Sequence, residues 1–301
     1  MPDLAVVHLV RRQNGIVPFE RFIASWRAHP AGVPNDLVIL FKGFKRNHTP
    51  EFDRLLEGIP YRRLLVSDRG FDISAYFEAI ERLEYQRYCF LNSFSRILVS
   101  GWLERMHRFS VQEGVGLVGA TGSAQSIVTG YTARHKDILA LPPMARLRAR
   151  IARVLTDRRP QVVLGRAWVW ALRLTGIWRP ARDFPMFPNY HLRTNAFMGT
   201  RNTLSRIRLG ALRTKLSAYA FESGNESLTN QVTNLGLRVL VVGRDGDAYE
   251  PERWHLSNTF WQSREENLLV ADNQTESYLA AGADQRAYLA QSAWGDNARP
   301  G

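Results

Sequence analysis

Residues 62–95 read RRLLVSDRGFDISAYFEAIERLEYQRYCFLNSFS, and this stretch decides the fold. An apolar strand at 62–66 runs into an Asp/Gly turn, a helix-length segment follows at 73–83, and a second apolar strand at 87–91 ends in small polar residues. Ligands of open α/β sheets bind just outside the carboxyl ends of the strands. The polar clusters 67–72 and 92–95 follow two such ends, so we expect them to form one binding site.

The preceding residues repeat the same alternation. The pattern predicts strands at 4–10 and 36–41, helices at 17–28 and 51–57, and a further strand at 115–119. The first strand is apolar throughout, as is typical of a strand buried on both faces of a parallel sheet. Strands that alternate with helices in this way predict an α/β fold with a mostly parallel, doubly wound sheet and flanking helices.

The alternation stops at residue 126 and resumes near residue 184. We expect helices at 203–212 and 226–235, a strand at 238–242 and a last helix ending near residue 290. The chain is therefore divided into a first half, 1–125, a helical insertion, 126–183, and a second half, 184–295. The tail, 296–301, is predicted to be disordered.

The composition is that of a basic globular protein. Among 301 residues, 40 Lys and Arg oppose 28 Asp and Glu, for a net charge of +12. A positive balance favours polyanionic partners such as anionic lipid, nucleic acid or phosphorylated substrates. The one cysteine, Cys89, lies in an apolar strand, so a buried, inert thiol in a reducing compartment is expected. We expect neither a signal peptide nor a transmembrane helix.

The order of several short motifs resembles a known family. After the Asp/Gly turn and the Leu-Asn-Ser strand end come Gly101-Trp102-Leu103 and an apolar strand ending in Gly119-Ala120-Thr121-Gly122-Ser123. This order is similar to the nucleotide-sugar half of GT-A-fold glycosyltransferases, above all family 2 enzymes and the F-type rhamnan synthesis proteins. The resemblance runs from residue 4 to about residue 278. Where such families carry Asp-x-Asp, this chain reads Asn92-Ser93-Phe94, without a carboxylate.

The resemblance implies a donor pocket in the first half. There the turn after the third strand would lie against the nucleotide base and ribose, although Asp72 can equally cap the following helix. The donor-pocket residues are Asp68, Arg69, Asp72, Asn92, Ser93 and Ser95. Serines and an asparagine make a poor magnesium site without a carboxylate. A divalent metal, Mn²⁺ or Mg²⁺, thus remains possible, but its usual ligands are absent and no ligand set is assigned.

The second half supplies candidates for the leaving group and the base. Cations and amides that can hold a diphosphate or an acceptor are His191, Arg193, Asn195 and Arg201. In family 2 enzymes a Glu-Asp pair before a helix supplies the base, and Glu222-Ser223 is similar to that pair. Glu222 is therefore the candidate base. Ser223 and Glu226 can instead form a capping box, and the polar run from Asp272 can be a helix cap.

The insertion contains most of the excess charge. Residues 146–182 hold ten arginines, one acidic residue, Asp157, and three tryptophans at 168, 170 and 178. Basic helices with tryptophan at the apolar boundary lie on anionic membranes. Arginines with aromatic residues also fit nucleic acid, and an ordinary solvated helix is a third interpretation. Membrane contact is favoured, because no nucleic-acid-binding signature is present.

The resemblance implies a glycosyltransferase, and the composition and basic insertion predict that it is cytoplasmic and peripherally membrane-associated. It would transfer a sugar from a nucleotide-sugar donor to a saccharide or lipid-linked saccharide in surface polysaccharide synthesis. The alternative is a non-catalytic scaffold or carbohydrate-binding protein that kept the fold, which the missing Asp-x-Asp supports. A nucleotide-dependent Rossmann enzyme is disfavoured, because no Gly-x-Gly-x-x-Gly follows the first strand.

Overall fold

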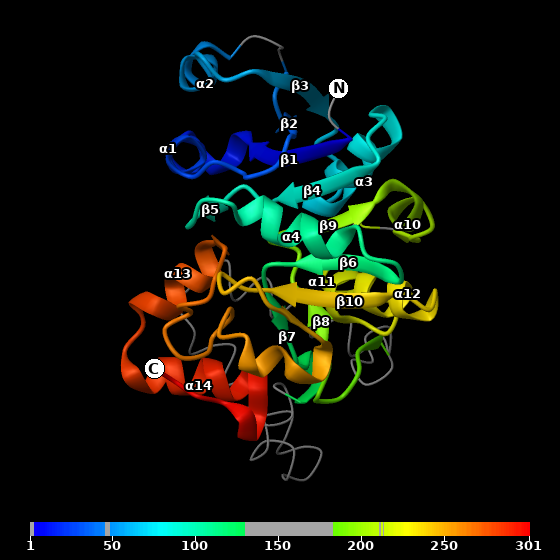
Figure 1. Cartoon of the computed structure of the whole chain (residues 1–301), viewed down its shortest axis with the longest axis vertical. Coiled ribbons are helices and arrows are strands. Elements are labelled where there is room, and N and C mark those ends of the chain that lie inside the picture. The colour runs from blue at the N-terminus through cyan, green and yellow to red at the C-terminus, as the bar shows by residue number, and fades with distance from the viewer. Residues whose placement is uncertain (1–2, 46–48, 130–182, 211, 213) are drawn as a thin grey trace, which may run out of the picture.

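A twisted eight-stranded sheet forms the centre of the molecule. The structure is a computed structural model that describes residues 3–45, 49–129, 183–210, 212 and 214–301 (Figure 1). The sheet order is β11-β10-β6-β9-β4-β1-β2-β3. The strands are β1 (Leu4–Arg11), β2 (Asp36–Lys42), β3 (Tyr61–Val66), β4 (Arg87–Leu91), β6 (Val115–Gly119), β9 (Ala196–Thr200), β10 (Arg238–Val242) and β11 (Ala248–Tyr249).

Most neighbouring strands are parallel. The exceptions are β9, which runs antiparallel to both β4 and β6, and the edge strand β11, antiparallel to β10. The arrowheads of β1, β4 and β10 point to the same side in Figure 1, which is also the side where α13 (Asn273–Ala280) lies. The predicted α/β, mostly parallel sheet is confirmed, and its carboxyl edge faces the carboxy-terminal helices.

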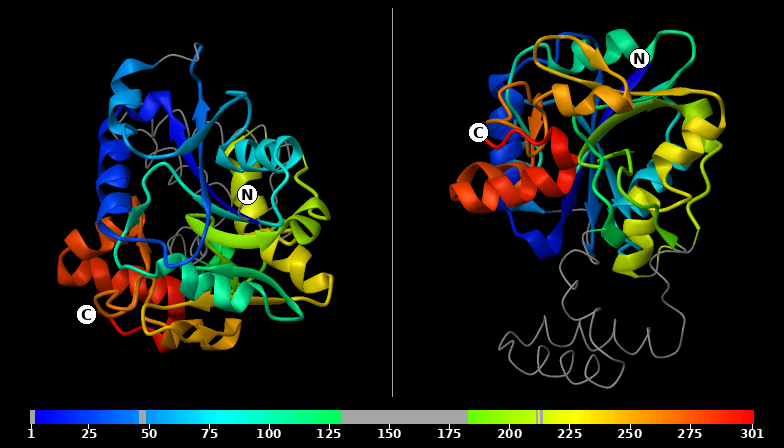
Figure 2. Two further views of the ribbon diagram at one scale, coloured as in Figure 1. Left: turned by 45° about the horizontal axis from the view of Figure 1, so that its top comes forward. Right: turned by 90° about the horizontal axis from the view of Figure 1, so that it is seen from below.

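Helices cover both faces of the sheet, and the two views of Figure 2 show them on either side. One apolar core contains side chains of α3 (Asp72–Arg82), α10 (Arg201–Ser205), α11 (Lys215–Ser223), α12 (Leu228–Asn234) and α14 (Ala283–Trp294). The other contains side chains of α1 (Val17–Ala28), α2 (Pro50–Leu55) and α4 (Trp102–Ser110). Alternate residues of β1 enter the two cores, for example Val7 and Val6. This arrangement explains why the strand is apolar throughout.

Two separate two-stranded sheets lie at the carboxyl edge of the central sheet. β5 (Arg96–Ile97) pairs with β12 (Val270–Ala271), and β7 (Gly122–Ser123) pairs with β8 (His191–Leu192). The first pair brings the start of α13 to the end of β4, and the second brings residues 189–195 to the end of β6. Segments far apart in the sequence therefore meet where the parallel strands end.

The bounds of the elements predicted in the first half agree with the structure within one or two residues. Cys89 is fully buried as expected, and burial raises the pKa of its thiol. The predicted helix at 203–212 is too long, because α10 ends at Ser205. Gln231 of α12 bonds both the backbone N–H and the carbonyl of Arg208, at 2.8 and 3.1 Å. These side-chain bonds take the place of helical partners, so the chain leaves the helix.

Helix α11 was not predicted, and the capping box proposed for Ser223 and Glu226 is wrong. Ser223 is the last residue of α11, and Ser227 caps α12 by accepting from the Asn230 N–H at 3.3 Å. The last predicted helix is two helices, α13 and α14, separated at Gly282. Residues 296–301, predicted to be disordered, contact the body: the Ser263 N–H donates to Arg299 O at 2.6 Å.

The basic insertion at 146–182 lies outside the described residues. None of the helices within the described ranges combines the length and apolar character needed to cross a bilayer.

Candidate functional site

The turn after β4 is held by a dense set of hydrogen bonds. The Asn92 side-chain oxygen accepts from the Phe94 N–H at 2.9 Å and from the Ser95 hydroxyl at 3.1 Å. The Asn92 N–H donates to the carbonyl of Asn195 at 2.9 Å, and the Asn195 side-chain oxygen accepts from Thr121 at 2.6 Å. The polar residues predicted after β4 and before β9 thus form one network at the carboxyl edge.

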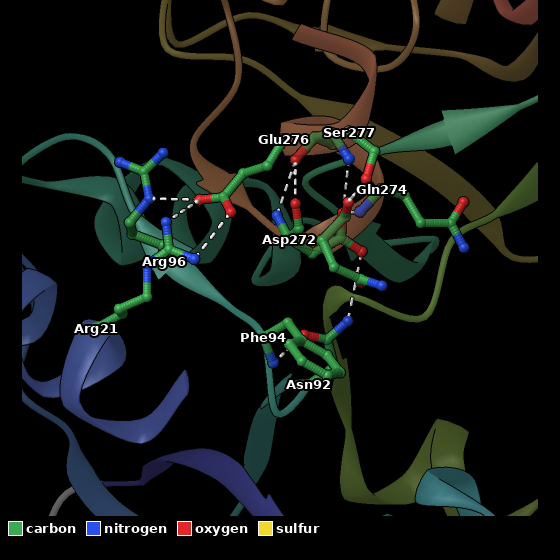
Figure 3. Close-up of polar contacts among 10 residues, drawn as sticks. Arg21, Asn92, Phe94, Arg96, Asp272, Gln274, Glu276 and Ser277 are labelled. Atoms are coloured by element: carbon green, nitrogen blue, oxygen red, sulfur yellow. Dashed lines mark hydrogen bonds and ion pairs between the residues drawn. The ribbon is translucent and has the colours of Figure 1, made fainter. Parts of the chain in front are cut away.

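Asp272 joins this network from α13. It caps the helix, since its Oδ1 accepts from the N–H groups of Gln274 and Thr275, each at 3.0 Å. Its other oxygen, Oδ2, lies 3.4 Å from the Asn92 amide nitrogen. Figure 3 shows Asp272 between Asn92 and the first turn of α13. Asp272 therefore places a carboxylate next to the Asn92–Phe94 turn, which has none of its own.

Two arginines pair with Glu276 of α13. Glu276, one turn into α13, is ion-paired with Arg96 at 2.9 Å and with Arg21 of α1 at 3.1 Å (Figure 3). Both guanidinium groups are partly exposed. This ion-pair network ties α1, β5 and α13 together, and so fixes the cap at Asp272 relative to β4.

The Asp/Gly turn after β3 lies against two cations that the sequence analysis did not single out. Arg11, at the end of β1, is 3.4 Å from Asp72 Oδ1. Lys42, at the end of β2, is almost fully buried and donates to the carbonyls of Ser67 and Arg69, both at 2.9 Å. Arg11 and Lys42 directly follow the predicted strands at 4–10 and 36–41, and in the structure each is the last residue of its strand. Their position could have been inferred from the edge rule that was applied to β3 and β4.

The pKa values of this pocket follow from burial. Desolvation lowers the pKa of Lys42 and raises that of Asp72, while Arg11 acts in the opposite sense on Asp72. The N-cap of α3 is Phe71, and Asp72 is the first helical residue, so the predicted cap is wrong. Asp68 and the side chain of Arg69 are exposed at the mouth of the turn. The Asp72 side chain is 35% exposed beside Arg11.

Glu222 lies beside Arg193 at the same edge of the sheet. The Arg193 guanidinium is 3.9 Å from Glu222 Oε1, and the Thr194 N–H donates to the same oxygen at 3.3 Å. His191 is buried, with Nδ1 2.8 Å from the Asn189 carbonyl, and desolvation lowers its pKa to about 4. The imidazole is therefore neutral at pH 7. It supports the backbone next to Arg193 and adds no positive charge.

The loop 258–265 contacts Arg193 and α13, and the sequence analysis did not identify it as part of the site. The Arg193 guanidinium lies over the Phe260 ring at 4.5 Å. The Trp261 indole N–H donates to Gln274 O in the first turn of α13 at 3.3 Å, and the Trp261 backbone N–H donates to Glu265 at 2.9 Å. The loop therefore connects Arg193 and Glu222 with the residues around Asp272.

Arg201 lies elsewhere. It begins α10, and its N–H donates to the Gln86 carbonyl at 2.9 Å, just before β4 begins. Because β9 is antiparallel to β4, the chain leaves β9 at the amino edge of the sheet, opposite the site. Its predicted role at the diphosphate is therefore wrong. The other candidates are placed at the carboxyl edge, namely Asp68, Arg69, Asp72, Asn92, Ser93, Ser95, His191, Arg193, Asn195 and Glu222.

The described side chains do not fit a divalent cation by themselves. Within the part of the chain that the structure describes, no three His, Cys, Asp or Glu side chains converge. At the Asn92 turn the available carboxylate is Asp272, and its Oδ1 is used in capping. A hard cation with six or more oxygen ligands needs more than this set supplies.

No protein-family model matches the sequence, and neither does any curated protein. The mannosyltransferase PcManGT from Pyrobaculum calidifontis, in complex with GDP-Man and Mn²⁺, is a solved structure similar to this chain, with a TM-score of 0.44 and 13% identity over 85% of this chain and 60% of its own. Two structures of S. aureus TarS have TM-scores of 0.31, at 11% and 10% identity. The matched region is 40% of this chain in both cases, and 21% and 35% of the two TarS chains. This chain therefore spans less than two thirds of the length of each of these three structures.

Proposed function

We propose that this chain is a glycosyltransferase that moves a sugar from a nucleotide-sugar donor to a saccharide or lipid-linked saccharide acceptor in surface polysaccharide synthesis. One observation carries the proposal. The carboxylate of Glu222 lies beside the Arg193 cation, at the sheet edge where the Asn92, Asn195 and Asp272 network also meets. A base and a cation at one site are the two groups that glycosyl transfer requires.

Glu222 is the proposed general base. Its contacts with Arg193 and Thr194 both use Oε1, which leaves Oε2 to take the proton of an acceptor hydroxyl. As the hydroxyl oxygen bonds to the anomeric carbon, the bond from that carbon to the diphosphate breaks, and the diphosphate leaves with the electron pair. A positioned carboxylate typically contributes 10²–10⁴-fold to such a step.

The cations of the site are proposed to stabilise the departing diphosphate. Arg193 is held in place by Glu222 and the Phe260 ring, and Lys42 and Arg11 end neighbouring strands of the same edge. Preorganised cations stabilise developing negative charge without reorganising during the reaction. The described donor set does not fit a divalent cation, so no step is assigned to a metal. Asp68 and Asp72 are proposed to hydrogen-bond the nucleotide.

A non-catalytic carbohydrate-binding protein with the same fold is the second candidate. The observation that favours it is the Asn92-Ser93-Phe94 turn, which lacks a carboxylate. Such a protein would bind a saccharide without needing Glu222 as a base. Turnover of a nucleotide sugar, lost on Glu222→Gln, decides against this candidate.

The location of the enzyme is also a proposal. The ten arginines and three tryptophans of residues 146–182 support binding to an anionic cytoplasmic membrane face, where a lipid-linked acceptor would be available. Flotation with vesicles with and without acidic lipid tests this. Equal binding to neutral vesicles, or none at all, contradicts the electrostatic version.

Ligand binding is the first test of the function. Melting temperatures are measured with UDP, GDP and dTDP and with UDP-glucose, UDP-galactose, GDP-mannose and dTDP-rhamnose. A ligand at ~100 times its dissociation constant stabilises the folded state by about 2.7 kcal/mol. We expect one nucleotide series to raise the melting temperature. No shift with any of these ligands contradicts the proposed function.

A further inference from the structure

Glu265 is a buried carboxyl group that the proposed reaction does not yet use. Its side chain is 4% exposed, and Oε1 accepts the Trp261 N–H at 2.9 Å. Oε2 is buried and has no hydrogen-bond partner among the described residues. Burying an unpaired polar atom costs folding free energy, so such atoms need an explanation, and a bound ligand is one.

The loop around Glu265 contains four residues with strained backbone φ angles. Asn258, Trp261, Ser263 and Glu265 have φ values of 51°, 44°, 48° and 53°, in the left-handed region that residues other than glycine rarely adopt. The loop is held there by side-chain bonds to other segments. Gln262 donates to the carbonyl of Asn297 at 2.8 Å, and Trp294 donates to that of Phe260 at 2.7 Å. Strain maintained in this way is characteristic of ligand-binding loops.

The loop contacts two other segments of the site, which lie near further unpaired atoms in the sequence. Phe260 is beneath Arg193, and Trp261 bonds the first turn of α13, whose cap Asp272 contacts Asn92. The Ser93 hydroxyl and the Asn195 amide nitrogen are buried and likewise unpartnered within the described part of the chain. A carboxyl oxygen, a hydroxyl and an amide N–H are thus left without partners in segments near the carboxyl edge of the sheet. A sugar hydroxyl can donate to the first and pair with either of the others.

The buried environment of Glu265 favours its neutral form. Burial and then the Asp272 charge raise its pKa to about 8, while the Trp261 N–H acts in the opposite sense. On α13, Tyr278 is the other titratable neighbour, and its hydroxyl donates to the Ser263 carbonyl at 3.0 Å. On the loop itself, Arg264 and Glu266 are exposed. At pH 7 the protonated carboxyl can both donate and accept, which suits an alcohol.

We propose that Glu265 is a specificity-determining residue whose Oε2 hydrogen-bonds a ring hydroxyl of the donor's sugar. The inference rests on the proposed function. The Asn92 turn is the expected place of the diphosphate, and the next group along the donor is the sugar, which brings it toward Asp272 and this loop. A neutral acid recognises the hydroxyl, whereas an ionised carboxylate beside Asp272 adds a second negative charge and loses its donor.

The test compares the sugar nucleotide with its parent nucleotide at two pH values. Calorimetric dissociation constants are measured in EDTA at pH 6.5 and pH 9, for the best sugar nucleotide of the panel and for its nucleoside diphosphate. Because about a tenth of Glu265 remains protonated at pH 9, sugar-nucleotide binding should weaken about tenfold relative to the parent nucleotide. Glu265→Gln keeps a donor and an acceptor that do not ionise, so its ratio should not change with pH. Glu266→Gln, the exposed neighbour, should behave as the wild type.

The outcomes separate this inference from the function itself. A pH-independent ratio in the wild type, or the same tenfold change in Glu265→Gln, overturns the role of Glu265 even when turnover is present. Nucleotide binding without any added contribution from the sugar does so as well. Absence of binding by every ligand overturns both the function and the inference.

Discussion

Two regions of the molecule place an aspartate at the start of a helix, and the structure uses them differently. Asp72, at the start of α3, pairs with Arg11 and lies near the buried Lys42. Asp272, before α13, caps its helix and contacts the Asn92 amide. The first region contains the cations Arg11 and Lys42, from β1 and β2, and is proposed to bind the nucleotide. The second contains Arg193 together with the carboxyl groups of Glu222, Glu265 and Asp272, and is proposed to bind hydroxyl groups and to transfer the proton.

The largest expected effect tests the second region. Glu222→Gln keeps the size and hydrogen bonding of the side chain but removes its basicity, so turnover should fall by at least ~100-fold while donor binding and melting temperature stay unchanged. Steady-state kinetics with a nucleotide sugar measure this. Glu226→Gln, four residues on and exposed, is the matched control. Retained turnover in Glu222→Gln would assign the base elsewhere.

Lys42→Met tests the first region. The change removes two hydrogen bonds from the buried Lys42 ammonium to the carbonyls of Ser67 and Arg69, and a hydrogen bond to a charged group contributes about 1.5–3 kcal/mol. We expect a lower unfolding free energy in urea and weaker nucleotide binding. Lys45→Met removes an exposed cation from the same loop as a control. Unchanged nucleotide affinity in a folded Lys42→Met protein would show that this region does not bind the nucleotide.

The pH dependence of stability tests the neutral state of Glu265. Its pKa is about 8 in the folded protein and about 4.5 when exposed, so the folded state holds a proton that the unfolded state has lost. The unfolding free energy should fall by about 1.4 kcal/mol per pH unit well below pH 8, and by about 1.6 kcal/mol in all from pH 6.5 to pH 8. Burial lowers the pKa values of His8 and His191 to about 3 and about 4. Their titration affects stability below pH 6.5, where it makes the unfolding free energy rise with pH.

Urea denaturation at several pH values measures this slope. Glu265→Gln should be flat over the same window and more stable than the wild type at pH 8, because no carboxylate is buried. An equal slope in both proteins would mean that another group titrates.

The two aspartates can be compared directly. Asp272→Ala removes two cap bonds and should destabilise the protein by about 1 kcal/mol, whereas Asp72→Ala removes no cap and should cost less. Thermal unfolding of the two variants measures the difference. A larger loss in Asp72→Ala would show that its ion pair with Arg11 outweighs a helix cap.

Chelation should have the smallest effect. Side-chain cations are proposed to stabilise the diphosphate, so EDTA should change turnover by no more than a few-fold. Complete loss of turnover in EDTA, restored by manganese or magnesium, would contradict this prediction. It would mean that the metal has ligands beyond the described set and that the Asn92 turn binds a metal, as the equivalent turn does in the resembling family.

The sequence determined the sheet and its binding edge to a large extent. Strands buried on both faces are continuous apolar runs, so β1, β2, β4, β6 and β10 were predicted within a residue of their bounds. The edge rule for parallel strands then placed the residues after β3 and β4 on one side of the sheet. The helix cap at Asp272 could be predicted as one interpretation of the polar run that begins there, because capping depends on residues within one turn.

Tertiary structure alone decided how the site was assembled. Arg201 was misplaced because a strand's direction in the sheet is set by its partners, and β9 runs against its neighbours. Glu265 and Trp261 were missed because their loop has no periodicity, and its left-handed residues are held by contacts with α13, α14 and the carboxy-terminal residues. Local sequence patterns depend on neighbours within a turn or a strand, whereas the loop 258–265 depends on contacts between segments far apart in the sequence.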